Sequence, residues 1–535
     1  MVVDQLIART QSLCPECLRL LDAEIFESKG KVWIRKNCLK HGETLELYWG
    51  DAELFKKAQK FRKEQGKKSE NPIISKEIPV CPVDCGLCNL HLSHTALANI
   101  VVTNRCDLSC WYCFFFAQKM GYVYEPSTEQ IKEMLKLLRT QKPVPCNAVQ
   151  FTGGEPSLRE DILSIIRMAK EEGFNHIQFN TNGIRMARDG AFVKALKEAG
   201  VSTVYLSFDG VSGKTNYKNH FEAPTVLANA RKANLGIVLV PTIIKSVNDH
   251  EIGDILRFGL GNIEVVRAVN YQPVSLVGRM PGREREKFRI TIPDTIRLIE
   301  EQTGGMLVKE DFYPVPTVTS LTKFVEAITN HPTYELSTHF ACGMATYVFK
   351  EDEKVIPITR FLDVDGLTEY LDQVSEELKK QGGVSKTVEV LKTAYKLKGF
   401  IDEKNQPRGL NFLNLLKNVL TKGSYAALGE IHTKSMFVGM MHFQDLYNYD
   451  VERVKRCCIH YATPDGRIVP FCAFNVIPEW YRDAIQRKYS VSIEEWEKKT
   501  GKKLKDDLYK RKPLEASREE KDACQLMNQE MFGTP

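Results

Sequence analysis

The sequence has no apolar segment that approaches the ~20 residues a membrane-spanning helix requires. Its first residues, Met1 to Gln5, also lack the basic region and the apolar run of a secretory signal peptide. These two absences argue against an integral membrane protein and against an exported one. We therefore expect a cytoplasmic protein, with peripheral contact to a membrane surface as a further option.

Neither sign of charge dominates the sequence. The chain has 74 Lys and Arg against 68 Asp and Glu, a net charge of +6, which is far from the strongly basic profile of nucleic-acid-binding proteins. We therefore expect no nucleic-acid partner. No internal repeat or low-complexity tract occurs either. A chain of 535 residues with 43% hydrophobic residues is expected to form two to four domains.

Cysteine, in contrast, is abundant. The chain has fifteen cysteines, and in a cytoplasmic protein such a number indicates metal binding rather than disulfide bonds. All of them except Cys146 and Cys524 fall into short motifs, and we interpret these two as structural. We therefore base the prediction of function on the cysteine motifs.

The central motif is a loop with three closely spaced thiols. Cys106, Cys110 and Cys113 directly follow a strand-like run from Ala98 to Asn104. Cysteine thiolates hold iron–sulfur clusters, and a four-iron cluster normally takes four of them. Three thiolates would leave one iron free to bind another molecule. A zinc site or buried structural thiols are the alternatives, and the motifs further along the chain argue against both.

Residues 98–274 alternate between strand-like and helical patterns. The clearest helix is predicted over 128–139, with Ser127 and Gln130 forming a capping box at its start. Six strand–helix units predict an α/β fold in which a parallel sheet curves into a partial barrel of the TIM type, with the chemistry at the carboxyl ends of its strands. The predicted strands are 98–103, 148–152, 176–180, 203–208, 237–242 and 263–270.

Polar motifs lie at the predicted carboxyl ends of three of these strands. Paired glycines at Gly153 and Gly154 let backbone approach a ligand closely, and the carboxylate of Glu155 can accept hydrogen bonds from an ammonium group. Further motifs at the ends of the next two strands contain Asn182, Ser207 and Asp209. For each of these three residues alone, a turn that caps the strand is nearly as good an explanation.

The spacing Cys106-x3-Cys110-x-Tyr112-Cys113 and the Gly-Gly-Glu-Pro segment resemble the signature of radical SAM enzymes. The resemblance implies that the free iron binds S-adenosylmethionine and that one electron then generates a 5′-deoxyadenosyl radical, which abstracts hydrogen. It makes the three cysteines the catalytic residues. It also implies a ferredoxin- or flavodoxin-type electron donor. The residues implied to bind the cofactor are Tyr112 (at the adenine), Gly153, Gly154 and Glu155 (at the amino group), and Asn182, Ser207 and Asp209 (at the ribose and carboxylate).

The N-terminal region predicts a separate mononuclear metal site. Cys14 and Cys17 form one knuckle, and Cys38 with His41 forms a second, with a strand-like segment between them. This is the ligand pattern of a small metal ribbon with four ligands, of which the fourth is His41 or a cysteine from elsewhere in the chain. The ion is zinc, or iron if the site is rubredoxin-like, and the sequence does not distinguish them. We predict a charged, solvated helix and linker at 51–72.

Two further cysteine sets predict auxiliary clusters. Cys81, Cys85 and Cys88 lie just before the barrel, and the second set is dispersed over the C-terminal half of the chain. We therefore predict three four-iron clusters in total, of which two are auxiliary. Histidines beside clusters are more often hydrogen-bond partners than ligands, so we do not assign His91 or His94. The second set comprises Cys342, Cys457, Cys458 and Cys472.

These motifs divide the chain into five predicted parts. The C-terminal part that holds the dispersed cysteines is expected to be mainly helical. The boundaries are an N-terminal metal ribbon with linker (1–72), an auxiliary-cluster segment (73–97), the partial barrel (98–290), a C-terminal domain for an auxiliary cluster and the substrate (291–480) and a helical tail (481–535).

The combination of the ribbon, both auxiliary sets and the central motif resembles the archaeal tetraether lipid synthases. That resemblance implies carbon–carbon bond formation between the terminal methyl carbons of phytanyl chains, with two S-adenosylmethionine molecules used per bond. The substrate would be an archaeal diether lipid of the archaeol type, and the product a macrocyclic archaeol or tetraether lipid. It also implies three four-iron clusters and a rubredoxin-like iron.

Two alternatives are weighed against this prediction. A radical SAM methyltransferase acting on a pterin such as methanopterin would use the same core motifs, because it also attaches carbon to an unactivated position. An iron–sulfur electron-transfer protein is the non-enzymatic alternative. The segments around Glu155 and Asn182 argue against an electron carrier, because it needs no cofactor cradle.

Overall fold

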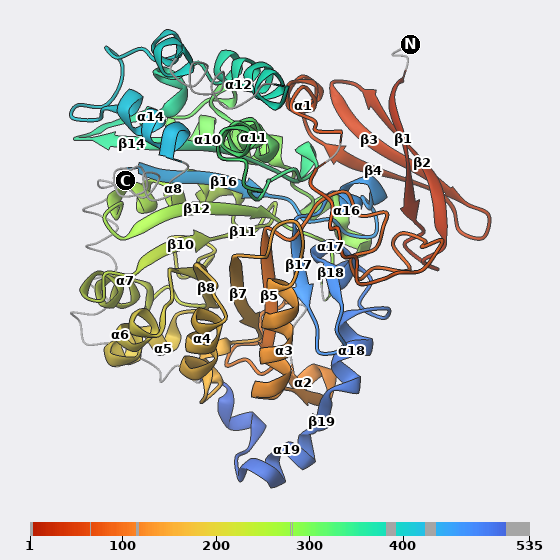
Figure 1. The fold of residues 1–535 in the computed structure, drawn as a ribbon. Helices are drawn as coiled ribbons and strands as arrows, with labels where there is room; N and C mark the ends of the chain where they lie inside the picture. The colour runs from red at the N-terminus through yellow and green to blue at the C-terminus, as the bar shows by residue number, and fades with distance from the viewer. Residues whose placement is uncertain are drawn as a thin grey trace.

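The computed structural model describes residues 4–64, 66–113, 117–278, 280, 282–380, 392–422 and 435–509 (Figure 1). Cys524, and the part of the predicted helical tail after 509, lie outside the described residues. None of the helices in the described ranges combines the length and the apolar character that a membrane crossing needs.

The N-terminal unit is a four-stranded antiparallel sheet, in the order β1-β2-β3-β4. Its strands are β1 (Gln5–Leu13), β2 (Leu20–Ser28), β3 (Lys31–Cys38) and β4 (Gly42–Trp49), followed by helix α1 (Ala52–Gln59). Asp51 caps α1 by accepting a hydrogen bond from the Leu54 amide at 2.9 Å. We predicted a solvated helix here, but Leu54, Phe55 and Ala58 are buried because this face packs on the core.

Six parallel strands form the predicted partial barrel. They lie side by side in chain order, which is the arrangement that successive strand–helix units produce (Figure 1). These strands are β5 (Leu97–Thr103), β7 (Ala148–Gly153), β8 (His176–Thr181), β9 (Thr203–Ser207), β10 (Gly236–Val240) and β12 (Val266–Pro273). The last strand begins three residues later than predicted, because Val265 and Val266 donate to the Asn262 carbonyl in a turn.

The sheet continues beyond the barrel on both edges, with strands from the C-terminal half of the chain. At one edge β16 pairs in parallel with β12, and β14 pairs antiparallel with β16; at the other, β17 pairs in parallel with β5. No pattern in the sequence predicts that these strands share one sheet with the barrel. The added strands are β13 (Tyr313–Pro314), β14 (Gly343–Glu351), β15 (Lys354–Pro357), β16 (Ser435–Met441), β17 (Ile459–Ala462) and β18 (Ile468–Pro470), and short β11 (Thr242–Ile243) pairs with β12.

Helices cover the outer face of the barrel strands. The structure confirms the helix predicted over 128–139, with the Ser127–Gln130 capping box in place and its apolar face buried. The barrel helices are α2 (Ala117–Met120), α3 (Thr128–Arg139), α4 (Ile162–Glu171), α5 (Ile184–Arg188), α6 (Gly190–Ala199), α7 (Ala223–Lys232), α8 (Ile252–Gly261), α9 (Arg285–Phe288) and α10 (Ile292–Thr303).

The C-terminal half adds a separate helical layer and a small terminal unit. The layer packs around its own apolar cluster beside β14, at the top of the view in Figure 1. Its helices are α11 (Thr319–Thr329), α12 (Val364–Lys379) and α14 (Phe412–Lys422). The terminal elements are α16 (Val451–Lys455), α17 (Phe471–Val476), α18 (Arg482–Lys488), β19 (Ser490–Ser492), which pairs with β6 (Tyr122–Tyr124), and α19 (Ile493–Thr500).

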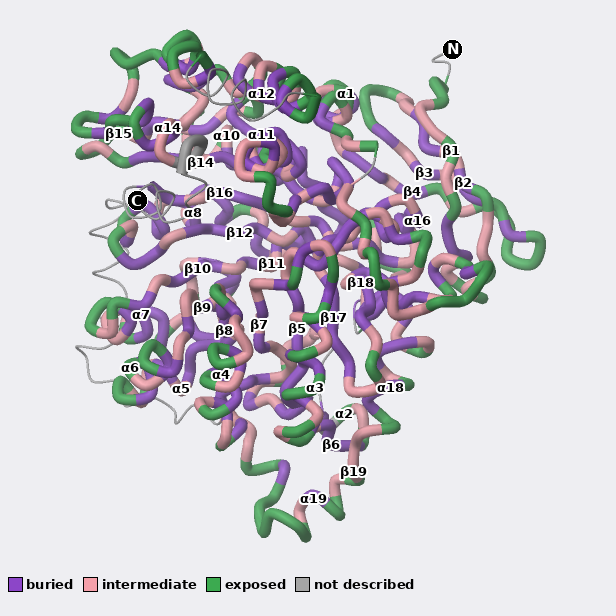
Figure 2. The backbone as a smooth tube through the Cα atoms, in the orientation of Figure 1, coloured by how far each residue is buried: buried purple, intermediate pink, exposed green. Residues whose placement is uncertain are grey.

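A buried charged network joins the N-terminal sheet to the barrel. Figure 2 shows that the central barrel strands are mostly buried, whereas the exposed residues lie on the outer loops and helices. Arg289 forms a two-pronged pair with Asp445, with N–O distances of 2.5 and 3.1 Å, and also contacts Glu46 of β4 at 3.2 Å. Lys36 of β3 donates to the Leu446 carbonyl at 2.6 Å. The ribbon therefore holds the segment around residue 445, which follows β16.

We expect Asp445→Ala to reduce the free energy of unfolding by about 3–5 kcal/mol, because it removes the two-pronged partner of the buried Arg289 and leaves only the single contact with Glu46. Although burial alone would raise it, the Arg289 guanidinium lowers the pKa of Asp445 to about 2. The stabilisation is therefore present above the unfolded pKa of about 4 and is lost as the pH falls toward 2. Denaturant unfolding at neutral and acidic pH measures both effects.

The matched control removes an exposed ion pair. Glu301 pairs with Arg297 at 2.8 Å, and both side chains are more than half exposed. Glu301→Ala should therefore change the stability by no more than about 0.5 kcal/mol. Equal losses in the two variants would contradict a structural role for the buried pair.

Candidate functional site

The three-cysteine loop begins where β5 ends. Cys106, Cys110 and Cys113 are all partly accessible, and the Leu108 amide donates to the Cys106 sulfur at 3.4 Å. Backbone N–H groups that point at sulfur are typical of iron–sulfur sites, because they stabilise thiolate charge. The loop therefore provides three accessible soft ligands, which fits a four-iron cluster with one iron left free.

The Gly153–Gly154 pair holds this loop against the end of β7. The Gly154 amide donates to the Thr103 carbonyl at 2.8 Å, and the Glu155 amide donates to the Arg105 carbonyl at 2.7 Å. A Cβ atom on Gly153 would lie 2.0 Å from the Thr103 oxygen, and one on Gly154 would lie 2.0 Å from the Arg105 oxygen. We predicted that these glycines let a ligand approach the backbone closely. In the structure, the segment that approaches them is the backbone of Thr103 and Arg105, just before Cys106.

Glu155 ties the end of β7 to the end of β8. Its Oε1 accepts from the Thr181 hydroxyl at 2.8 Å and from the Ser157 amide at 3.1 Å, and its Oε2 accepts from the Asn182 amide at 2.8 Å. Its side chain is only 1% exposed, and this burial raises the pKa of the carboxyl group. Glu155 therefore holds the backbone at the ends of β7 and β8 in place through contacts within the protein alone.

Asn182 continues this network to the cysteine loop. Its Nδ2 donates to the Asp107 carboxylate at 2.6 Å, next to the first cysteine. Burial, followed by the charge of Glu155, raises the pKa of Asp107 to about 7. Asn219 donates to the backbone carbonyls of Asn182 and Ser207, at 2.7 and 2.6 Å. The ends of β8 and β9 are thus joined to the cysteine loop.

Asp209 is the centre of a second buried cluster, which contains a residue that the sequence analysis missed. The carboxylate accepts from the Tyr112 hydroxyl and from the Thr242 amide, and it pairs with Lys218 at 2.9 Å. The Lys218 ammonium lies 5.0 Å from the centre of the Tyr112 ring and interacts with the charges of Cys110 and Cys113. Only its place in a loop after a strand's carboxyl end could have indicated Lys218.

The end of the described chain braces the loop from outside. Arg105 pairs with Glu125 at 2.8 Å and with Asp507 at 2.9 Å. The Tyr509 amide donates to the Asp107 carbonyl at 2.8 Å. The predicted tail is therefore part of the site's support, which no local motif indicated.

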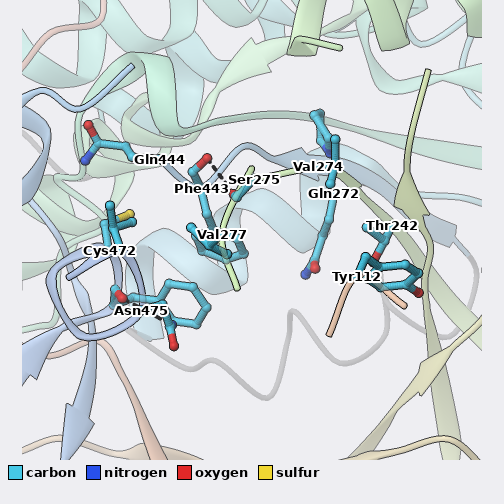
Figure 3. A pocket seen from close by; sticks show the side chains of 13 residues that line it. Tyr112, Thr242, Gln272, Val274, Ser275, Val277, Phe443, Gln444, Cys472 and Asn475 are labelled. Carbon is cyan, nitrogen blue, oxygen red and sulfur yellow. Dashed lines mark hydrogen bonds between the residues drawn. The ribbon is translucent and has the colours of Figure 1, made fainter. Parts of the chain in front are cut away.

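A cavity of about 100 Å³ lies beside the cysteine loop. Figure 3 shows Tyr112, Thr242 and Gln272 on one side of it and Cys472 with Asn475 on the other. Thr242 and Gln272 follow or end barrel strands, whereas Cys472 and Asn475 belong to α17. The cavity therefore connects the central cysteine motif with one of the predicted auxiliary-cluster ligands.

The four predicted ribbon ligands come together at one point. The donor atoms of Cys14, Cys17, Cys38 and His41 all lie within 4.8 Å of one another. Hydrogen bonding from the Lys40 amide is the main cause that lowers the pKa of Cys38 to about 6. Three sulfurs and one imidazole nitrogen in this arrangement fit one tetrahedral ion. The lowered pKa of Cys38 favours the thiolate that binds such an ion, although burial raises the pKa of Cys14.

The structure also gathers the cysteines of the dispersed set. Burial raises the pKa values of Cys457, Cys458 and Cys472, and the charge of Cys342 raises each of them further. The buried Arg453 donates to the Cys342 sulfur at 3.4 Å. Charge interactions with Cys342 therefore link thiols from three distant segments, and Arg453 is a compensating cation beside one of them; thiolates of this kind are the ligands of iron–sulfur clusters.

Cys81, Cys85 and Cys88 form a distinct group. Together with His91 they line a small hollow, and the Cys85 amide donates to the Tyr481 hydroxyl at 3.1 Å. His91 Nε2 donates to the Cys457 carbonyl at 2.7 Å. This is the hydrogen-bonding role that we expected for a histidine near a cluster.

Two family models match parts of the chain. The model described as Radical SAM superfamily matches residues 100–259, which contain the central cysteines and the carboxyl ends of five barrel strands. The model described as HMPTM N-terminal zinc ribbon domain matches residues 6–50, which contain all four clustered ribbon ligands. Both matches coincide with sites that the structure assembles.

The chain is 46% identical over 502 residues to the 7,8-dihydro-6-hydroxymethylpterin dimethyltransferase of Methanocaldococcus jannaschii, covering 92% of this chain and 97% of that protein. It is 31% identical to the GTP 3′,8-cyclase of Clostridium acetobutylicum over 37% of this chain and 61% of that one. A solved structure of the radical S-adenosylmethionine methyltransferase TsrM from Kitasatospora setae gives a TM-score of 0.29 at 10% identity, covering 75% of this chain and 72% of that chain.

The first of these relatives overturns the substrate that we predicted. A protein similar over nearly the whole chain is a pterin dimethyltransferase, so the predicted tetraether lipid synthase activity and its archaeal diether lipid substrate are wrong. We predicted a lipid enzyme from the cysteine sets. These sets indicate only which metal clusters a chain is able to bind. Their spacing carries no information about the substrate, so they cannot identify it.

We expect Gly154→Ala to remove about four iron atoms per chain, because its Cβ would displace the Arg105 carbonyl and the cysteine loop that follows. Gly399→Ala is the control, since nothing lies within 4 Å of the place that its Cβ would occupy, and iron should be retained. Iron and sulfide analysis of anaerobically purified protein measures the difference. Full iron content in Gly154→Ala would contradict this account of the loop.

We also expect Cys38→Ser to remove one metal ion per chain and to lower the unfolding temperature, because ribbon folding is coupled to metal binding. Cys146→Ala is the control: Cys146 is a buried cysteine outside the ligand sets and should leave the metal content unchanged. Elemental analysis by mass spectrometry identifies and counts the ion. Retention of that ion by Cys38→Ser would exclude Cys38 as a ligand.

Proposed function

This chain belongs to the radical SAM superfamily and to the family of the Methanocaldococcus jannaschii pterin dimethyltransferase, and on that premise we propose that it methylates a reduced pterin. The main support for this proposal is the 46% sequence identity to that relative, over 97% of its length. This was the alternative prediction from the sequence. The cavity beside the cysteine loop supports it, because it offers a compact site lined by rings and amide groups.

The central loop would hold the catalytic cluster. Cys106, Cys110 and Cys113 are its proposed ligands, and membership of the superfamily implies a four-iron cluster and S-adenosylmethionine. When bound, this pair supplies one-electron chemistry strong enough to break an unactivated carbon–hydrogen bond. The protein's part is to hold the loop rigid and dry. The hydrogen bonds from Gly154 and Glu155 to the chain before Cys106 support this role.

The surrounding strand ends would form the S-adenosylmethionine cradle. We retain Tyr112, Gly153, Gly154, Glu155, Asn182, Ser207 and Asp209 as the proposed cradle residues. Lys218 joins them as a positioning residue. Its ammonium pairs with Asp209 and lies close enough to Cys110 and Cys113 for their charges to interact, so it would offset negative charge on the loaded loop.

Two auxiliary clusters and one mononuclear ion complete the proposal. Cys81, Cys85 and Cys88 would hold one cluster, and Cys342, Cys457, Cys458 and Cys472 the other. The match to a zinc ribbon favours zinc at Cys14, Cys17, Cys38 and His41. Because Cys472 lines the cavity, the second auxiliary cluster would lie next to the substrate. An electron donor of the ferredoxin or flavodoxin type would supply the reducing electron.

The test is anaerobic incubation of the reconstituted protein with a reductant, S-adenosylmethionine, 7,8-dihydro-6-hydroxymethylpterin and a one-carbon donor. Each methyl group replaces a hydrogen that the 5′-deoxyadenosyl radical removes, so its carbon must come from a second molecule. One reaction offers S-adenosylmethionine as the only methyl donor, which would leave S-adenosylhomocysteine; a parallel reaction adds a methylene-tetrahydropterin, which would leave the tetrahydropterin, and the reductant supplies the electrons in both. We expect mass spectrometry to show the pterin with one or two added methyl groups, together with 5′-deoxyadenosine. Cys110→Ala should abolish both products, because it removes a proposed ligand of the catalytic cluster.

A second variant controls for nonspecific damage. Cys146→Ala should retain both products, because this cysteine lies in the core away from every proposed ligand set. Formation of 5′-deoxyadenosine with the pterin unchanged, under conditions where the pterin is bound, would contradict the proposed reaction.

A further inference from the structure

The cavity wall formed by α17 contains a hydrogen-bond acceptor without a donor. Asn475 is 3% exposed, and its side-chain oxygen has no hydrogen-bond partner among the described residues. Its Nδ2 group, in contrast, donates to the Phe471 carbonyl at 3.2 Å and to the Tyr461 hydroxyl at 3.4 Å. The amide nitrogen of Asn475 is therefore hydrogen-bonded within the protein, whereas its oxygen has no donor among the described residues.

The orientation of the amide is fixed by its partners. A carbonyl oxygen can only accept a hydrogen bond, so the atom facing Phe471 must be the amide nitrogen. The unpartnered atom is then the carbonyl oxygen of Asn475, and Asn475 lines the cavity (Figure 3). Buried acceptors are rarely left without a donor in folded proteins, because the unpaired group is costly. A ligand in the cavity is the natural source of that donor.

The neighbouring side chains favour a flat ligand. The rings of Phe443 and Phe471, both of which line the cavity, stack with their centres 4.0 Å apart and their planes 23° apart. Gln272 and Thr242 lie on the other side of the cavity from Phe443 (Figure 3). A planar heterocycle could lie against the rings while its polar edge meets the amides.

The position of Asn475 also relates the ligand to the chemistry. Cys472 lies three residues earlier on α17, so the two side chains share one face of the helix. Tyr112 of the cysteine loop lines the opposite side of the same cavity. A molecule held by Asn475 would therefore lie between the proposed catalytic and auxiliary clusters.

We propose that Asn475 is a specificity-determining residue, whose side-chain oxygen accepts a hydrogen bond from an N–H group on the pyrimidine edge of the reduced pterin. The pyrimidine ring carries such donors at its 2-amino group and at N3. The pterin ring packs against Phe443 and Phe471. This inference rests on the proposed function and adds to it the part of the substrate that is recognised and the residue that recognises it.

The test is equilibrium binding of 7,8-dihydro-6-hydroxymethylpterin to the cluster-loaded protein, without reductant so that no turnover occurs. Asn475→Leu keeps the side chain's approximate volume and removes the acceptor, so we expect pterin affinity to fall roughly 10- to 100-fold. Binding of S-adenosylmethionine and the visible absorption of the clusters should stay as in the wild type. Asn475→Asp keeps an acceptor oxygen and should bind pterin more tightly than Asn475→Leu.

A matched control removes another buried amide. Gln141 is 4% exposed, and both ends of its amide lack partners among the described residues, but it does not line the cavity. Gln141→Leu should therefore leave pterin affinity unchanged. Equal losses in Gln141→Leu and Asn475→Leu would overturn the proposal, because the effect would then be general destabilisation.

Substrate analogues test the same contact from the side of the ligand. Pterins methylated at N3 or at the 2-amino group lose one donor each, and at least one of them should bind the wild type more weakly. The same analogue should lose little further affinity in Asn475→Leu, because the contact is already absent. This comparison supports the contact even if the Asp variant fails to fold.

The outcomes separate this proposal from the proposed function. Wild-type pterin affinity in Asn475→Leu would overturn the role of Asn475 alone. Failure of the wild type to bind pterin, with clusters loaded and S-adenosylmethionine bound, would overturn the proposed function and this inference with it.

Discussion

The site depends on the close contact between the ends of β5 and β7. Two backbone hydrogen bonds, from Gly154 and Glu155, hold the chain just before Cys106, and neither glycine leaves room for a side chain. From there the network continues through Glu155 to Asn182, and from Asn182 to Asp107 in the cysteine loop. The loop that would carry the catalytic cluster is therefore positioned mainly by backbone and buried polar groups, which is the rigidity that preorganised chemistry requires.

The barrel and its strand-end motifs could be predicted from sequence because their signals are local. Alternating strand and helix patterns determine the order of β5 to β12, and parallel strands bring Glu155, Asn182 and Asp209 to the same edge. The ribbon ligands were predictable for a similar reason, since knuckle spacing is a local signal. In contrast, nothing local to Lys218 marks it as a partner of Asp209, and the braces from Asp507 and Tyr509 come from the far end of the chain.

The composition of the cavity wall explains why sequence motifs could not predict the substrate. Its walls combine β12, the segment after β16, and α17, which are far apart in the sequence and meet only because β16 and β17 extend the barrel sheet. The buried pair of Arg289 with Asp445 then fixes the wall that contains Phe443 and Gln444. The cysteine sets have the spacing of iron–sulfur ligands, whereas residues that line the cavity, such as Asn475 and Gln272, have no spacing signature.

The most direct measurement of the central claim is isotope transfer from the substrate. The reconstituted enzyme would be given 7,8-dihydro-6-hydroxymethylpterin that carries deuterium at its non-exchangeable carbon positions, and the 5′-deoxyadenosine would be analysed by mass spectrometry. The account predicts deuterium in the 5′-deoxyadenosine, because a radical formed at the cysteine loop removes hydrogen from a pterin held in the adjacent cavity. Unlabelled 5′-deoxyadenosine, produced while the labelled pterin is bound, would contradict it.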